Sequence, residues 1–503
     1  MKPMNSILKS CVFLTVILVS TGCNKPIKKT IFTNQIHPCS ANPSYWQYLN
    51  KPILLLGGSS DDNLFQHTSP DLDKELDLLR RSGGNFVRCT MSGRDSGNVY
   101  PFYLDPLTRL YDLNRWEDEY WRRFDNFLKA THDRQIIVQI EIWATYDFYT
   151  RIGTRWSDGT DSWDRNPFNP ARNSNYTTET SGLPVIFKSD GVSLINPFFT
   201  TILPRYDETP VVLGFQQKFV DKLLSVSLEY DHVLYCMDNE TNAEPEWGIY
   251  WAEYVRGKAS DRNIDIEVTE MWDTFDPTDG EVKDAVVQNP ATHFFTKRSG
   301  VSNTLYNPDT YSFLDISNHN AQVGETHFKT GIYVWNKIQE SGNIRPVNNV
   351  KIYGAGPSGD WNGSSKDGLE RFWRNVFAGA AAVRFHRPTA GLGNSEIALS
   401  HIKSMRMLTD SIDLFRFAPA NELLDDRSDN EAFCLSNNEK EHILYFPAEG
   451  SVNLTAKPGK YSLSWLHIGS SAWQEPMETD LPGIIQTPDN DQWAVLVKGI
   501  STR

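Results

Sequence analysis

The residues best placed for chemistry follow the apolar run Val233–Met237, which ends abruptly in Asp238-Asn239-Glu240. A carboxyl group held partly away from water at the end of a buried strand can protonate a leaving oxygen, as the general acid does when a bond between two sugars is cleaved. The amide of Asn239 could bind a sugar hydroxyl beside the reacting carbon. The alternative is a solvated carboxylate that caps the next helix. Because the pair follows an apolar strand in a fourth βα unit, we favour Glu240 as a general acid.

Two further polar side chains follow predicted strands. Arg88 stands near the end of the second strand, where it could orient a catalytic carboxylate through a bidentate pair or form a structural salt bridge. His319 ends the sixth strand and could bind a substrate hydroxyl or a second carboxylate, or serve as a structural donor. Both are candidate substrate-binding residues.

Three tryptophans, Trp143, Trp272 and Trp361, stand at or just beyond predicted strand ends. Indole rings suit the C–H faces of sugars, although a single tryptophan more often belongs to a core. Their shared position favours stacking on a sugar.

The elements that must hold these residues alternate short apolar runs with longer amphipathic segments, as expected of βα units on a parallel sheet. The predicted strands are Ile53–Gly58, Asn85–Met91, Gln135–Trp143, Val233–Glu240, Asn263–Trp272, Tyr311–Asn318, Val347–Gly354 and Ala381–His386. The predicted helices are Asp71–Ser82, Arg115–Asp133, Val211–Glu229, Glu325–Gln339, Leu369–Ala380 and Glu396–Leu414. We therefore predict an α/β chain with a (β/α)8 TIM barrel. An open doubly wound sheet is the alternative, but no Gly-x-Gly-x-x-Gly loop follows the first strand.

The predicted barrel covers residues 51–415, and residues 24–50 form a tether and N-terminal extension. The long polar stretch Thr145–Pro210 either folds over the barrel top and lines a cleft or is a variable surface excursion. After an acidic linker at 416–430, residues 431–503 predict a small all-β sandwich domain. Its predicted short strands, separated by turns such as Pro458-Gly459, are Ala432–Leu435, His442–Phe446, Val452–Leu454, Lys460–Trp465 and Trp493–Val497.

The N-terminus predicts export. Two lysines precede the apolar run Cys11–Val19, and small residues then precede Cys23, so residues 1–23 are typical of a lipoprotein signal peptide with Cys23 as the lipidated residue. Ordinary signal cleavage is the alternative. The tether Asn24–Thr30 is basic, which favours a periplasmic anchor over cell-surface display.

Composition limits the partners. The chain has 49 basic and 63 acidic residues and a net charge of −14, which argues against nucleic acid or an anionic membrane surface as a partner. Its 15 Trp and 20 Tyr lean slightly toward a carbohydrate partner. No His, Asp and Glu cluster has metal-ligand spacing, so we expect neither a metal nor a cofactor.

Several of these segments resemble clan A glycoside hydrolases. The resemblance rests on Asn85-Phe86-Val87-Arg88, on Asp238-Asn239-Glu240, on Ser317-Asn318-His319 and on the C-terminal stretches Tyr461–Trp473 and Asp491–Leu496. Within the clan, the layout resembles apiosidase-like barrels followed by a β-sandwich that carries a collagen-binding label, in lipoproteins of the Bacteroidetes type. The resemblance implies Glu240 as acid/base, Asn239 as the hydroxyl-binding amide and Arg88 as its support.

The chain departs from that family at strand seven, where the family has its nucleophilic glutamate. No acidic residue occurs between Glu340 and Asp360, and Val350 stands about where the glutamate would be. The partner of Glu240 could be Glu270 or Asp273 at the end of strand five, which we prefer, or Asp360 in the loop after strand seven.

We therefore expect hydrolysis of a glycosidic bond in a polysaccharide-derived oligosaccharide, with retention or inversion left open. The alternative is a barrel that binds glycans without cleaving them.

Overall fold

The computed structural model describes residues 34–93, 95–148, 162–187, 196–202, 210–241, 243–272, 304–317, 322–355, 363–437 and 440–500. In these ranges no helix is both long and apolar enough to cross a membrane.

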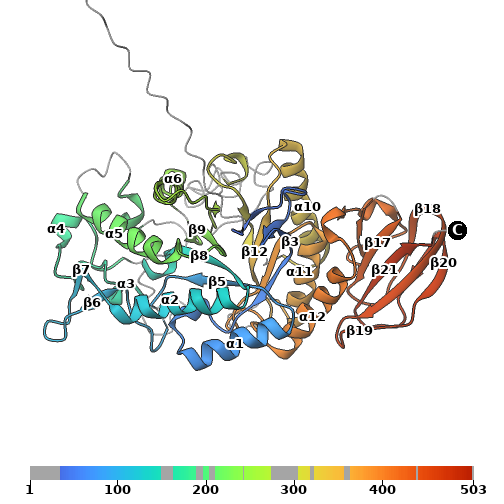
Figure 1. Ribbon diagram of the computed structural model, residues 1–503, viewed down its shortest axis with the longest axis horizontal. Helices are drawn as coiled ribbons and strands as arrows, with labels where there is room; N and C mark the ends of the chain where they lie inside the picture. Colours follow the sequence, from blue (N-terminus) through green and yellow to red (C-terminus); the bar gives the residue numbers. More distant parts are fainter. Residues whose placement is uncertain are drawn as a thin grey trace, which may run out of the picture.

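The larger part of the molecule is a barrel of eight parallel strands (Figure 1). In neighbour order these are β10 (Val268–Thr269), β9 (Val233–Asn239), β8 (Ile137–Ala144), β5 (Phe86–Thr90), β4 (Leu55–Gly58), β13 (Ala382–Phe385), β12 (Val347–Ile352) and β11 (Leu314–Asp315). Hydrogen bonds connect the two end strands: Ser312 N donates to Val268 O at 3.0 Å, and Thr269 Oγ1 donates to Phe313 O at 2.7 Å. The ring is thus nearly closed, and the predicted (β/α)8 barrel is confirmed.

Helices cover the outside of the barrel. They are α1 (Ser69–Arg81), α2 (Asp118–Asp133), α5 (Pro210–Ser227), α6 (Pro245–Asp261), α10 (Gly324–Ser341), α11 (Ser365–Phe377) and α12 (Glu396–Asp410). In α2 the buried residues Tyr120, Phe124, Phe127 and Leu128 recur at helical spacing and form the face that packs inward. The predicted ranges do not include α6, whose sequence contains two glycines.

The predicted first strand is two strands in the structure. Ile53 ends β3 (Lys51–Ile53), which pairs with β2 (Trp46–Tyr48) in a separate antiparallel sheet that also contains β1 (His37–Pro38). This sheet brings Trp46 to the barrel, where its Nε1 donates to Asn348 Oδ1 at 2.9 Å. Asn348 and Asp315 both bond the side chain of Gln139, at 3.0 and 2.7 Å. The lower barrel interior is therefore a hydrogen-bonded polar layer, a rigid base for the mouth above it.

The described parts of the long stretch after β8 pack against the barrel end. They are η2 (Thr145–Phe148), α3 (Ser162–Arg165), α4 (Thr178–Ser181) and η3 (Pro197–Thr200). Phe148 stacks on Phe198 at a ring distance of 4.0 Å, and Phe198 meets Trp143 of β8 edge-on at 5.3 Å. Together with the hairpin β6 (Phe102–Leu104) and β7 (Tyr111–Trp116), these segments form a wall beside β5 and β8.

The C-terminal part is an antiparallel sheet, orange to red in Figure 1, beside α10, α11 and α12. Its strands are β14 (Ala418–Pro419), β15 (Leu424–Asp425), β16 (Phe433–Ser436), β17 (Glu441–Phe446), β18 (Ser451–His467), β19 (Ala472–Trp473), β20 (Met477–Gln486) and β21 (Trp493–Gly499). Two predicted strands are joined in β18, whose register shifts between Leu454 and Gly459, and β20 is an additional strand. Tyr445 stacks on Trp373 of α11 at 5.1 Å, so the sheet shares apolar contacts with the barrel.

Candidate active site

Glu240 lies just beyond β9, on a backbone that few residues adopt. Its φ angle is 59°, in the left-handed region, whereas Asp238 and Asn239 before it are buried strand residues. The chain then returns to the sheet, since Thr241 N donates to Met271 O at 2.9 Å. A non-glycine residue here costs about 1–3 kcal/mol, and such residues cluster at functional sites. The strain turns Glu240 out at the barrel mouth, where 29% of its side chain is exposed.

A lysine of β12, the seventh barrel strand in chain order, faces Glu240. The ammonium of Lys351 is in contact with Glu240 Oε1, and its own side chain is only 2% exposed. From the same strand end, the hydroxyl of Tyr353 donates to the same carboxylate oxygen at 3.4 Å. A cation in contact with a carboxylate favours its ionised form. Glu240 is thus held as one half of an ion pair.

An irregularity in β12 delivers this lysine. Asn349 pairs with Val383 and Ile352 with Phe385, so two residues of β12 lie opposite one residue of β13. One of the two, Val350, joins the hydrophobic core, and the other is Lys351. Such bulges re-aim a side chain and are common beside active sites. The resemblance places Val350 at the position of the family's nucleophile, but the side chain that contacts Glu240 is that of the next residue, Lys351.

A second carboxylate, Glu141 of β8, lies deeper in the mouth and is fully buried. Its Oε2 is 3.3 Å from an Arg88 nitrogen, and the same nitrogen is 3.4 Å from Asp62 Oδ1. Burial raises the pKa of Glu141 to about 7, although Arg88 and Lys351 act to lower it. Arg88 therefore pairs with two buried carboxylates, Glu141 and Asp62, which matches the structural salt bridge that the sequence offered as its alternative role. The sequence signal was a polar residue at every second position, Gln139 and Glu141, in an otherwise apolar strand.

The structure places Glu270 behind its strand and away from the cleft. The side chain is 0% exposed, and its Oε1 accepts a hydrogen bond from Asp238 N at 3.0 Å. Its Oε2 fills space left by Gly248 of α6, where an added Cβ would lie only 2.0 Å away. Burial and the nearby Asp238 carboxyl raise the pKa of Glu270 well above its usual range. Glu270 is therefore not brought across the cleft from Glu240.

The other predicted binding residues divide into three groups. Trp143 and Trp272 are 2% and 6% exposed, so their rings are walls of the barrel end and not open platforms. Asn239 is 3% exposed, and its Oδ1 has no hydrogen-bond partner among the described residues, so its amide is available at the site. Outside the described residues lie Asp273, His319, Asp360, Trp361 and the lipidation candidate Cys23.

Further cations at the mouth are neutralised by acidic partners. Arg387 lies 3.3 Å from Asp61, 3.2 Å from Asp62 and 3.5 Å from Asp95. Arg384 lies 3.6 Å from Asp62 and is fully buried. Within the described residues, both arginines therefore have acidic neighbours.

The fold of this chain is similar to that of solved structures described as glycoside hydrolases. A glycoside hydrolase family 5 protein from Bacteroides vulgatus superposes with a TM-score of 0.59 at 13% sequence identity, over 92% of this chain and 92% of that one. A second structure, described as a glycoside hydrolase, gives a TM-score of 0.60 at 11% identity over 94% and 98%. This chain shares their (β/α)8 barrel fold. No protein-family model and no curated protein matches the sequence.

At the candidate site, the Glu240 carboxylate is thus paired with the Lys351 ammonium. Active sites of such barrels lie at the C-terminal ends of the strands, where Glu240, Lys351 and Tyr353 meet. The carboxylate can exchange a proton with a bound substrate, and the ammonium can stabilise the anion that remains. Neither Lys351 nor Tyr353 carries a carboxylate that could act as the nucleophile.

Proposed function

We propose that the protein hydrolyses a glycosidic bond in a polysaccharide-derived oligosaccharide, with Glu240 as the proton donor. The observation that supports this most strongly is the partly exposed Glu240 on a strained backbone at the C-terminal mouth of a glycoside hydrolase fold. Asn239, with its unpartnered Oδ1 among the described residues, is the amide that binds a hydroxyl beside the reacting carbon.

Lys351 shapes the proton transfer in this proposal. Once Glu240 has given its proton to the leaving oxygen, the ammonium in contact with it stabilises the carboxylate. The same contact opposes reprotonation of Glu240, so the enzyme works best at acidic pH.

The proposal assigns water activation to Asp273. Because Glu270 is buried against α6, Asp273 is the remaining one of the two carboxylates that the sequence offers after this strand. A water molecule between the two carboxyl groups leads to inversion at the reacting carbon. Proton NMR of the first sugar released reports its anomeric form, and a product of retained configuration contradicts this assignment.

The main test is product release from a panel of gluco-, galacto-, manno-, xylo- and arabino-oligosaccharides. Glu240→Gln keeps the shape of the side chain but removes its proton chemistry, so cleavage should fall by at least about 100-fold. Glu246→Gln is the matched control, an exposed glutamate in the first turn of α6, and should cleave like the parent protein. Unchanged cleavage by Glu240→Gln would remove Glu240 from the proposed mechanism.

A second candidate function is glycan binding without cleavage. It is favoured by Lys351, which contacts Glu240 from the strand where the related family has a carboxylate. In this case oligosaccharides bind, no panel member is cleaved, and Glu240→Gln leaves the catalytic readout at zero.

We also propose that the protein is exported and held in the periplasm by a lipid on Cys23, on the basis of the signal-like N-terminus alone. Metabolic labelling with a fatty acid should mark the parent protein and not Cys23→Ala. Equal labelling would contradict the anchor.

A further inference from the structure

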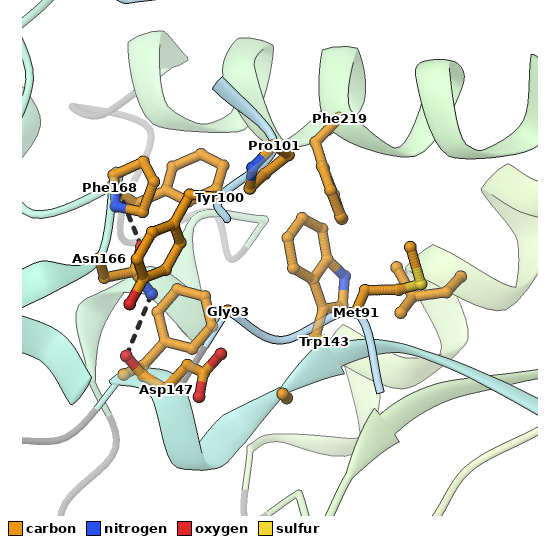
Figure 2. A pocket seen from close by; sticks show the side chains of 13 residues that line it. Met91, Gly93, Tyr100, Pro101, Trp143, Asp147, Asn166, Phe168 and Phe219 are labelled. Atoms are coloured by element: carbon orange, nitrogen blue, oxygen red, sulfur yellow. Dashed lines mark hydrogen bonds between the residues drawn. The ribbon is translucent and has the colours of Figure 1, made fainter. Parts of the chain in front are cut away.

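The contact between Glu240 and Lys351 depends on how the ends of β9 and β12 are held. On the side of β9, packing holds the strand. β8 pairs with β9 up to the last residue of each, and Trp143 near the end of β8 packs with Phe168 and Phe219 (Figure 2). The side chains drawn there leave a space of about 40 Å³, room for a few water molecules and not for a sugar ring. This wall is therefore a support for the strand that carries Glu240.

On the side of β12, side chains hold the backbone at the bulge. β12 pairs with β13 before and after the bulge, at Asn349 and Ile352. Between these residues, Val350 O accepts a hydrogen bond from Arg384 Nη1 of β13 at 2.9 Å. Val350 N donates to the hydroxyl oxygen of Ser317, just after β11, at 2.8 Å. Both backbone groups of the bulge residue are thus bound by side chains, one from each neighbouring strand.

Arg384 can hold the bulge because its guanidinium is itself fixed. The side chain is fully buried, and its Nη2 donates to Ser59 Oγ and, at 3.3 Å, to Asp61 O. Asp62 Oδ1 lies 3.6 Å from the same nitrogen. A guanidinium carries its donors in a rigid fork, so bonds at Nη2 also fix the direction of Nη1, which meets Val350 O. The other charged groups around it are Glu75 of α1, Arg88 of β5 and Glu141 of β8.

Ser317 is fixed by Asp315 of β11. Its backbone N donates to Asp315 Oδ1 at 3.0 Å, and its hydroxyl donates to the same oxygen. Because the hydroxyl proton is directed at the carboxylate, the hydroxyl oxygen is oriented to accept from Val350 N. Hydrogen bonds in such a chain polarise and strengthen one another. The buried chain from Val350 through Ser317 to Asp315 therefore ties the bulge to the next strand.

We propose that Arg384 and Ser317 are positioning residues for Lys351, because together they hold the β12 bulge in the form that directs Lys351 at Glu240. A bulge bends its strand and re-aims the side chain beside it, and Lys351 directly follows Val350. From this position its ammonium contacts Glu240 Oε1. That this placement governs proton transfer by Glu240 rests on the proposed function. The placement itself does not.

The first test measures the bulge in the full-length protein without substrate. Ser317→Ala and Arg384→Met each remove one anchor of Val350. In each variant, hydrogen–deuterium exchange of peptides that cover residues 350–353 should be about threefold to tenfold faster than in the parent. Crystal structures of the variants should show the Lys351 ammonium displaced from Glu240. If Arg384→Met does not fold, Ser317→Ala carries the test, because it deletes a single oxygen atom.

Arg345→Met is the matched control for loss of a buried arginine. Arg345 precedes β12 at the end away from the mouth, is 5% exposed, and donates through Nη2 to Thr304 O and Leu305 O, both at 2.7 Å. Its loss removes bonds from a guanidinium to backbone oxygens without touching the bulge. Exchange at 350–353 and the contact of Lys351 with Glu240 should therefore remain as in the parent.

The second test separates positioning from the charge of Arg384 itself. Displacement of Lys351 removes the cation that favours ionised Glu240, so the pH of half-maximal cleavage should rise in Arg384→Met as in Lys351→Met. A direct effect of the lost guanidinium charge would add to that of Lys351 in the double variant. Action through Lys351 predicts that the double variant shifts no further than Lys351→Met alone. Ser317→Ala changes no charge and should shift the profile in the same direction, by about half a unit.

Unchanged exchange at 350–353 with Lys351 still on Glu240 in both anchor variants overturns the proposal, and so do additive shifts in the double variant. Displaced Lys351 in a protein that cleaves no oligosaccharide supports the positioning role while the hydrolase proposal fails. Cleavage that depends on Glu240, with Lys351 in place in both anchor variants, overturns the positioning role and leaves the hydrolase proposal standing.

Discussion

Two glutamates at the ends of neighbouring strands, Glu240 after β9 and Glu270 after β10, have opposite surroundings. Glu240 is 29% exposed, contacts an ammonium and lies on a left-handed backbone. Glu270 is fully buried, accepts a backbone hydrogen bond from Asp238 and lies against a glycine of α6. The same side chain is thus partly exposed and ion-paired in one place and fills buried space in the other.

Distant segments therefore decide the role of a strand-end carboxylate. Gly248 gives Glu270 room behind the sheet, and the bulge of β12 gives Glu240 a cationic neighbour in front of it. Each feature can be altered alone, so the contrast between the two sides of the sheet can be tested by separate substitutions.

The largest effect is expected at the back of the sheet. In Gly248→Ala the new methyl group would collide with the buried Glu270 carboxyl, so the free energy of unfolding should fall by about 2–4 kcal/mol. Gly257→Ala is the matched control in the same helix, with nothing within 4 Å of the added carbon, and should stabilise by up to about 1 kcal/mol. Denaturant unfolding measures both. Equal effects would contradict the placement of Glu270.

The next effect concerns Glu141, a buried carboxylate that resembles Glu270 in burial but lies at the mouth. Its pKa is raised from 4.5 to about 7, so the folded state holds a proton that the unfolded chain releases. The stability that the protonated Glu141 contributes is fully present below about pH 4.5 and is lost as the pH rises to about 7. Relative to Glu141→Gln, the parent should lose up to roughly 3 kcal/mol over this range. A pH-independent difference between the two unfolding curves would contradict the assignment.

The smallest effect is expected from substitution of Lys351 in β12. Lys351→Met removes the cation that favours the ionised Glu240, so the pH of half-maximal cleavage should rise by about one unit. Lys337→Met on α10, an outer lysine paired with Glu340, is the control and should not move the profile. A profile that Lys351→Met leaves in place would show that the ion pair does not govern proton transfer.

The sequence predicted the barrel well because local pattern carries that information. Apolar runs such as Val233–Met237 and the leucine spacing before Gly83 follow directly from strand and helix periods. In the C-terminal sheet the prediction is weaker. The single strand Ser451–His467 was predicted as two because Pro458-Gly459 is a turn signal, which the structure accommodates in a bulge.

The site was only half predictable. Glu240 follows from its place after a buried strand, but Lys351 depends on a register shift against β13 that no local pattern reports. The orientation of Glu270 depends on a glycine in another element, for the same reason. Glu141 could have been found, because a charged residue interrupts an apolar strand at an inward position.

Glu240 is proposed as the reacting carboxyl and Glu270 as a structural one, and a comparison of kcat/KM for Glu240→Gln and Glu270→Gln on the same cleaved oligosaccharide tests this most directly. Each variant is first shown to be folded by its thermal transition. We predict a loss of at least about 100-fold for Glu240→Gln and a change within about threefold for Glu270→Gln. The reverse order, with Glu270→Gln inactive and Glu240→Gln unaffected, would contradict these roles.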